Sequence, residues 1–276
     1  MQKIGFSLDG KYYAPMTEVI QMLRDSGFDA VSPLWQRDIC LDDAVNTAVR
    51  CGLTLQSLHG PLRGLPGMWN AVPDQIAEDH LAALDCCAAY DIRLLVVHSW
   101  TGVDYTFSEG SLYFGHFDRL VERAQKNGIQ IAFENLEGAE YLDALMKRYK
   151  DCEAVGFCWD SGHERCYTPN RDFLKKYGDR LLITHLNDNF GVTDPAGTLR
   201  GTDDLHLLIG DGNTDWVSVM DRLKMATPQQ ILNFEFKIRP KGDRCVMDLY
   251  SKLPLQEFFQ KAYERTRSIA NDYLLK

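Results

Sequence analysis

Ten acidic and imidazole side chains stand at the ends of predicted β-strands or in the loops that follow them. Carboxylates and imidazoles are the groups that bind divalent cations and move protons near neutral pH. The set takes in five of the seven histidines of the chain. Its members are His59, His98, Glu134, Asp160, His163, His185, Asp188, Asp204, His206 and Glu235. No cysteine stands at these strand ends, which argues against a thiolate metal site.

Gathering so many ionisable groups in one place is unfavourable without compensation, because each unpaired buried charge costs several kcal/mol. Taken singly, each residue also fits a hydrogen-bonded core position or half of an ion pair. Taken together, they fit a bound cation, which neutralises the carboxylates and uses the imidazole lone pairs. Mixed ligands of this kind suit Mn²⁺, Mg²⁺, Co²⁺, Fe²⁺ or Zn²⁺. The sequence therefore predicts a divalent-cation site.

The elements that position these residues alternate in type along the chain. Short, nearly continuous apolar runs, typical of parallel strands covered on both faces, alternate with segments of helical period. Strands are expected at residues 3–8, 30–34, 54–59, 94–98, 130–134, 154–160, 181–186 and 230–235. Helices are expected at residues 17–26, 41–51, 73–90, 117–127, 139–150, 171–177, 216–224 and 255–273, the third opening on Pro73.

Eight such rounds in 276 residues predict one (β/α)₈ barrel and a single domain over residues 1–276. A doubly wound open sheet is the alternative, disfavoured because no Gly-x-Gly-x-x-Gly follows an early strand. Long loops at 99–115, 187–213 and 236–254 follow the fourth, seventh and eighth strands. Barrel enzymes build their active sites at this end.

Composition and charge limit the classes of partner. The formal net charge is −9, whereas proteins that bind nucleic acid usually carry a basic surface. A basic cluster after the eighth strand is most simply a solvated loop; it comprises Lys237, Arg239, Lys241 and Arg244. The N-terminal residues do not resemble a signal peptide, and no apolar run is long enough to span a membrane. With sparse cysteines, we expect a cytoplasmic protein. The oligomeric state stays open, a homo-oligomer included.

Five short motifs resemble the xylose isomerase-like TIM-barrel family. They are Gly5-Phe6, Phe133-Glu134-Asn135, Trp159-Asp160-Ser161-Gly162-His163, His185-Leu186-Asn187-Asp188 and Phe234-Glu235-Phe236. The resemblance covers essentially the whole chain. This family holds sugar phosphate isomerases and epimerases together with the AP endonucleases of family 2.

The isomerase and epimerase branch implies one divalent cation and a catalytic pair of glutamates. The implied ligands are Glu134, Asp160, His185 and Glu235. Glu134 and Glu235 would share the acid and base roles in a proton transfer next to a carbonyl, through an enediolate. The resemblance also implies that His163 and Glu140 contact substrate oxygens. Gly191 stands where the ketose epimerases carry an arginine.

The endonuclease branch implies a metal-dependent phosphodiesterase with two or three zinc ions. Its nine ligand types can all be placed here, as His59, His98, Glu134, Asp160, His163, His185, Asp204, His206 and Glu235. The acidic balance favours the isomerase of carbohydrate metabolism, with a small sugar-like substrate, over an enzyme acting on DNA. A barrel that binds metal without catalysis is disfavoured because both glutamates are present.

Three further residues receive roles at the predicted site. Trp100 would cover the apolar face of a sugar, or else pack its own loop. Asp188 would orient His185 or a metal-bound water. Lys237 would contact the substrate.

Overall fold

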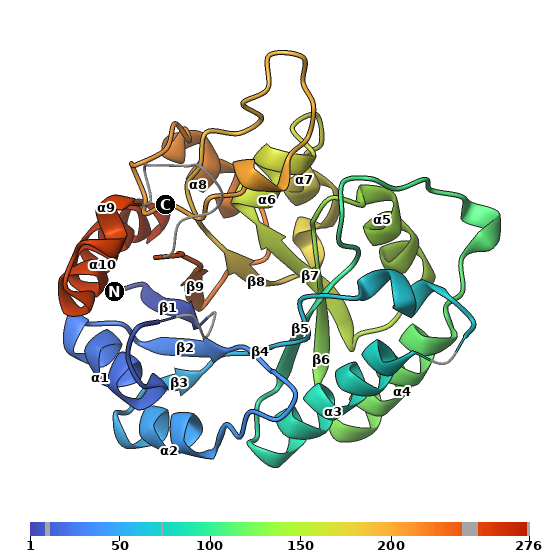
Figure 1. The fold of residues 1–276 in the computed structure, drawn as a ribbon, viewed down its shortest axis with the longest axis horizontal. Helices are drawn as coiled ribbons and strands as arrows, with labels where there is room; N and C mark the ends of the chain where they lie inside the picture. Colours follow the sequence, from blue (N-terminus) through green and yellow to red (C-terminus); the bar gives the residue numbers. More distant parts are fainter. Residues whose placement is uncertain (9–11, 73, 239–247, 275–276) are drawn as a thin grey trace.

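Short strands form the centre of the molecule, inside a ring of helices (Figure 1). Most of their side chains are buried, as expected for parallel strands covered on both faces. The computed structural model describes residues 1–8, 12–72, 74–238 and 248–274. The strands in these residues are β1 (Lys3–Leu8), β2 (Ala30–Pro33), β3 (Thr54–Leu55), β4 (Leu58–His59), β5 (Leu94–His98), β6 (Gln130–Glu134), β7 (Val155–Asp160), β8 (Leu181–His185) and β9 (Ile231–Phe234).

The strands form two parallel arcs that close on each other. One arc runs β3-β2-β1-β9 and the other runs β4-β5-β6-β7-β8. Single parallel bridges join the arcs, Leu34 to His59 on one side and Leu186 to Phe234 on the other. An open doubly wound sheet would leave two free edges, so closure at both seams confirms the predicted TIM barrel.

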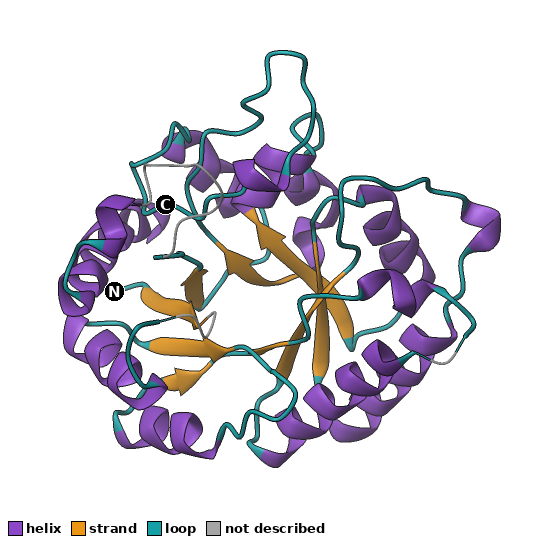
Figure 2. Cartoon of the chain, viewed as in Figure 1, coloured by secondary structure: helices purple, strands orange, loops and turns teal. Residues whose placement is uncertain are grey.

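Helices surround the strands as an outer ring (Figure 2). They are α1 (Met16–Ser26), α2 (Asp42–Arg50), α3 (Gln75–Ala89), α4 (Gly115–Asn127), α5 (Ala139–Arg148), α6 (Ser161–Tyr167), α7 (Phe173–Tyr177), α8 (Trp216–Lys224), α9 (Asp248–Ser251) and α10 (Leu255–Leu274). Short 3-10 turns lie at Leu65–Trp69, Glu109–Ser111, Gly178–Arg180 and Gly201–Asp203. Among the residues described, none of the helices combines the length and apolar character needed to cross a bilayer.

The segment predicted as one strand over 54–59 forms two strands instead. Residues of β3 pair with β2, Ala30 opposite Thr54, whereas β4 pairs with β5, Leu58 opposite Leu95. The chain thus changes its hydrogen-bonding partner between Leu55 and Leu58. An apolar pattern reports burial and not pairing, so the sequence could not show this break.

Two helix predictions need correction. The helix expected from Pro73 begins at Gln75, because the Asp74 side chain caps it by accepting the Ile76 N–H at 3.1 Å. Pro73 itself lies outside the described residues. The prediction also missed α6, which starts directly after β7 and is capped by Asp160.

A compact apolar cluster fills the barrel interior below the strand ends. It consists of Leu94, Val96, Ala132, Cys158 and Ile183, which are at most 8% exposed. These side chains face inward from β5, β6, β7 and β8 and close the barrel from below. On the other side of the barrel the interior is more polar, since the Gln56 and Asn233 side chains lie beside Gly5 of β1.

Candidate metal centre

Four side chains from four neighbouring strands meet at the mouth of the barrel. Glu134 ends β6, Asp160 ends β7, His185 ends β8, and Glu235 directly follows β9. One potential ligand atom from each lies within 4.8 Å of the other three. Glu134, Asp160 and His185 are almost completely buried. The predicted ligand set therefore converges in space.

His185 lies between two carboxylates. Its Nδ1 is 3.2 Å from Glu134 Oε1 and 3.0 Å from Glu235 Oε2. Two atoms that bind one cation at about 2.1 Å, with angles of about 90–110°, lie about 3.0–3.4 Å apart. The three atoms therefore have the spacing and the chemistry of ligands to a shared divalent cation.

Asp160 is held by several hydrogen bonds, including those of two asparagines that the sequence analysis did not single out. Asn187 Nδ2 donates to its two carboxylate oxygens at 3.1 and 3.0 Å, and the His163 N–H donates at 2.7 Å. Asn135 exchanges hydrogen bonds with the Asp160 backbone at 2.9 Å. In the sequence motifs, Asn135 directly follows Glu134 and Asn187 lies two residues after His185. This position next to a predicted ligand was the signal in the sequence for their role.

Glu134 also faces a second set of potential ligands through its other oxygen. Glu134 Oε2 lies 3.1 Å from His59 Nε2 and 3.4 Å from His98 Nε2. The two imidazoles meet edge to face, with centroids 4.8 Å apart. The sequence placed both histidines here, and the structure brings them to the same carboxylate.

A third set gathers around Asp204. Asp204 Oδ1 lies 2.9 Å from His206 Nε2 and 3.6 Å from His163 Nε2. His206 has a positive φ of 51°, a backbone conformation that is uncommon outside glycine and concentrates at functional sites. The nine zinc ligands that the endonuclease resemblance implies therefore form one contiguous group.

Cys158 lies closer to the site than the sequence analysis allowed. One ligand atom each of Cys158, Glu134 and His185 lies within 4.8 Å of the others. Cys158 is two residues before Asp160 on β7, so both side chains face the barrel interior. Burial raises the pKa of the Cys158 thiol. This favours a neutral thiol, consistent with a site built from carboxylates and imidazoles.

The ionisable groups compensate one another's charge. Burial opposes ionisation of Glu134, but the His185 and His98 imidazoles outweigh it and hold the pKa of this carboxyl well below its ordinary range. Burial likewise opposes protonation of His163, yet Asp160 and Asp204 raise its pKa to about 10. Protonated imidazoles thus neutralise the carboxylates when no cation is bound. A bound cation would neutralise them instead and would displace these protons.

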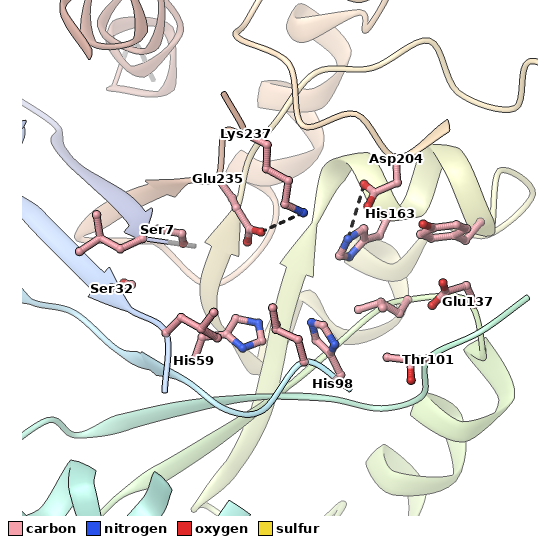
Figure 3. Close-up of a pocket in the computed structure, with 15 residues that line it drawn as sticks. Ser7, Ser32, His59, His98, Thr101, Glu137, His163, Asp204, Glu235 and Lys237 are labelled. Carbon is pink, nitrogen blue, oxygen red and sulfur yellow. Dashed lines mark ion pairs between the residues drawn. The ribbon is translucent and has the colours of Figure 1, made fainter. Parts of the chain in front are cut away.

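A cavity of about 200 Å³ reaches the site at Glu235 (Figure 3). The other three predicted ligands are not among its lining residues. Its polar lining is Ser7, Ser32, His59, His98, Thr101, Glu137, His163, Tyr167, Asp204, Glu235 and Lys237, and its apolar lining is Leu8, Leu34, Leu62 and Leu136. Lys237 Nζ lies 3.6 Å from Glu235 Oε1, and both residues line the cavity. The other residues of the basic cluster, Arg239, Lys241 and Arg244, lie outside the described residues.

Two residues expected near the substrate are engaged elsewhere. Glu140 accepts hydrogen bonds from Tyr105 Oη at 2.7 Å and Arg171 Nη2 at 2.9 Å, and it is not among the cavity-lining residues. Trp100 stacks on Tyr141 with centroids 4.1 Å apart, and it is also absent from that lining. Trp100 therefore packs its own loop.

Asp188 contacts a loop and not His185. Its carboxylate accepts hydrogen bonds from the N–H groups of Asn189, Gly210 and Thr214 and from the Trp216 indole, at 2.8–3.2 Å. Its backbone pairs with Leu207 in an antiparallel bridge. Asp188 thus fixes the loop that carries Asp204 and His206.

Glu137 and Tyr167 line the cavity although the sequence analysis did not select them. Glu137 lies three residues after Glu134, in the loop between β6 and α5. Tyr167 ends α6, which was not predicted as a helix. Glu137 lies in the loop after β6, the strand that ends in Glu134, and this position in the sequence could have indicated that it lines the cavity.

Residues 19–250 match the model of a family described as xylose isomerase-like TIM barrel. The chain belongs to this family. Among curated proteins, the uncharacterised protein y4fM of Sinorhizobium fredii is 35% identical over 129 residues, 44% of this chain and 38% of y4fM. The chain matches less than half the length of the curated relatives.

Solved structures share the fold of this xylose isomerase-like barrel at low sequence identity. The structure of the IOLI protein with a bound zinc atom has a TM-score of 0.75 and 18% identity, over 99% of this chain and 100% of that one. A D-tagatose 3-epimerase-like protein has a TM-score of 0.63 and 19% identity, over 96% and 99% of the two chains. At these low identities, the similarity shows a shared fold and no more.

Proposed function

We propose that this protein is a divalent-metal-dependent isomerase or epimerase of a sugar-like small molecule. The observation that carries the proposal is the convergence of Glu134 and Glu235 on His185, at 3.2 and 3.0 Å from its Nδ1. Moving a proton next to a carbonyl needs an acid and a base around one electrophilic centre. The folds of an epimerase-like protein and of a zinc-containing one are similar, which supports this class.

Glu134, Asp160, His185 and Glu235 would hold the cation. When bound, a divalent cation supplies Lewis acidity that polarises a substrate carbonyl. Glu235 lines the cavity, where it takes the proton from the carbon next to that carbonyl. Burial opposes ionisation of Glu235, but His206, His185 and Lys237 outweigh it and hold the pKa of this carboxyl well below its ordinary range. Glu235 is therefore ionised at neutral pH, as a base must be.

The other cavity residues bind and orient the substrate. Glu134, which contacts His185 but does not line the cavity, shares the proton-transfer role. His163, on the cavity wall, contacts a substrate hydroxyl. A cavity of about 200 Å³ suits a small molecule, and the net charge of −9 disfavours a nucleic acid.

Hydrogen exchange tests this function. The metal-loaded protein is incubated in D₂O with a panel of aldoses, ketoses and their phosphates. Deuterium is expected at the carbon next to the carbonyl of at least one compound. Glu235→Gln should slow the exchange about 10²- to 10⁴-fold, whereas the exposed Glu122→Gln should not change it. Absence of exchange across the panel, with metal verified in place, contradicts the proposal.

A phosphodiesterase with two or three zinc ions is a second candidate. The contacts of His59 and His98 with Glu134 Oε2, and of His206 with Asp204, favour it. The test is cleavage of an abasic DNA duplex by the zinc-loaded protein. We expect no cleavage. Cleavage that is lost in His59→Ala or His98→Ala would place this candidate first.

A further inference from the structure

Glu137 occupies the cavity wall away from Glu235 and Lys237. It lies in the loop between β6 and α5, and in Figure 3 it stands on the opposite side of the cavity from these two residues. Thr101, Leu136 and Tyr167 line the same cavity. Glu137 thus belongs to the chamber that contains the metal centre but is separate from the ligand cluster.

The Glu137 carboxyl is incompletely satisfied. Its Oε2 is buried and has no hydrogen-bond partner among the described residues. Such atoms are rare in folded proteins, because burial removes the hydrogen bond to water without replacing it. Burial raises the pKa of Glu137. Because Glu137 also lines the cavity, a turn of its carboxyl would bring an oxygen to a ligand hydroxyl there, which can either donate to that oxygen or accept from its proton.

The neighbouring groups restrict the kind of ligand. Asp204 lies close enough to oppose ionisation of Glu137, and Tyr167 and Thr101 offer only neutral hydroxyls. A phosphate or carboxylate placed here would be repelled by the acidic groups. His163 is the nearby cationic group, and it already faces Asp160 and Asp204. This end of the cavity therefore suits an uncharged hydroxyl.

Glu140 provides the contrast. Its two carboxylate oxygens are taken by Tyr105 and Arg171, and it lies outside the cavity lining. It lies three positions after Glu137, in the first turn of α5. Of these two glutamates, Glu137 is the one that both lines the cavity and has an unsatisfied oxygen.

We propose that Glu137 binds a hydroxyl group of an uncharged polyol portion of the substrate, at the end of the cavity away from Glu235. The proposal deepens the proposed function, on which it rests for the use of this cavity as the substrate site. It assigns Glu137 a substrate-binding role and places no proton-transfer step on it.

Binding of ribitol, an uncharged polyol, tests the assignment without requiring turnover. Isothermal titration calorimetry is done on the Mn²⁺-loaded wild type and on Glu137→Ala, Glu137→Gln, Glu140→Gln and Glu122→Gln. Loss of one buried hydrogen bond should weaken ribitol binding about 10-fold in Glu137→Ala. Glu137→Gln keeps a carbonyl acceptor and should bind more tightly than Glu137→Ala. Metal content and the thermal midpoint show that each variant is folded and loaded.

The outcomes separate the two proposals. Weakened binding in Glu137→Ala, with Glu122→Gln like the wild type, supports the assignment. It is overturned if the wild type does not bind ribitol, if Glu137→Ala binds it as tightly as the wild type, or if Glu140→Gln alone weakens binding. Ribitol binding that depends on Glu137, together with no deuterium exchange on any sugar, would retain the polyol site and reject the isomerase.

Discussion

Glu235 Oε2 lies 3.0 Å from Nδ1 of His185, so the last strand of the barrel meets the preceding one through a carboxylate and an imidazole. Without a cation, only a proton on Nδ1 makes this contact favourable. Burial opposes that proton, but nearby groups including Glu134 outweigh it and raise the pKa of His185 well above its ordinary value. A divalent cation that replaces the proton would be bound by both the Glu235 carboxylate and the His185 imidazole.

Removal of one carboxylate ligand should weaken cation binding. Asp160→Asn and Glu235→Gln each remove a charged oxygen ligand while they keep the side-chain shape. We expect each to lower metal affinity at least about 10-fold, the scale seen when only the surroundings of a metal ligand change. Metal content after mild chelation, measured by mass spectrometry, checks this. Glu122→Gln, on the exposed face of α4, serves as the control. Full metal retention in both ligand variants would refute the ligand assignment.

Asp188 should matter for the stability of the loop that carries Asp204 and His206. Asp188→Asn loses acceptor capacity, because an amide nitrogen cannot accept the hydrogen bonds that the carboxylate takes from the loop. We expect a loss of about 2–4 kcal/mol in the free energy of unfolding. Urea unfolding measures it, and hydrogen exchange over residues 204–216 should increase. Asp221→Asn, with a 67% exposed side chain, should change little. Equal stability of the two variants would contradict the role of Asp188.

Buried His80 should make the folded state less stable in mild acid. Burial lowers the pKa of His80 to about 4. The unfolded chain binds the proton below about pH 6.5, so stability falls as the pH drops from about 6.5 towards 4. The shift corresponds to about 3 kcal/mol at most. Replacement by leucine removes the titration, so the wild type should lose more stability than His80→Leu over this window. Parallel stability curves from urea unfolding would argue against it.

Alanine substitutions at Gly27 and Gly52 should differ in cost, because an added Cβ would overlap a neighbouring side chain only at Gly27. Both follow a helix with positive φ, 110° and 69°. A Cβ at Gly27 would lie 2.6 Å from the Tyr263 ring, whereas one at Gly52 meets nothing within 4 Å. Gly52→Ala should cost about 1–2 kcal/mol from backbone strain alone. Gly27→Ala should cost clearly more, and similar midpoints in thermal unfolding would show that the Tyr263 ring yields.

The barrel and the four ligands could be predicted because parallel strands bring their carboxyl ends to one rim. Glu134, Asp160, His185 and Glu235 each end or follow a strand, so their convergence needs only the correct strand order. The split of 54–59 into β3 and β4 could not be predicted in this way. Its apolar residues are buried in either case, and only the pairing distinguishes one strand from two.

The substrate-facing residues were harder to predict because they lie in loops. Glu137 and Glu140 are three residues apart, and no periodicity indicates which of them lines the cavity. The contacts of Glu140 with Tyr105 and Arg171 decide the matter, and both partners are distant in sequence. Similarly, Asp160-Ser161-Gly162 reads as a turn, and only the capping bond to the His163 N–H reveals the start of α6.

Anomalous diffraction from a metal-soaked crystal tests the central claim most directly. We expect one divalent cation at the barrel mouth, bound by Glu134, Asp160, His185 and Glu235 at about 2.0–2.2 Å. Its identity follows from data collected on both sides of the absorption edge. Absence of an anomalous peak among these four residues, or peaks confined to the His59–His98 and Asp204–His206 sides, would contradict it.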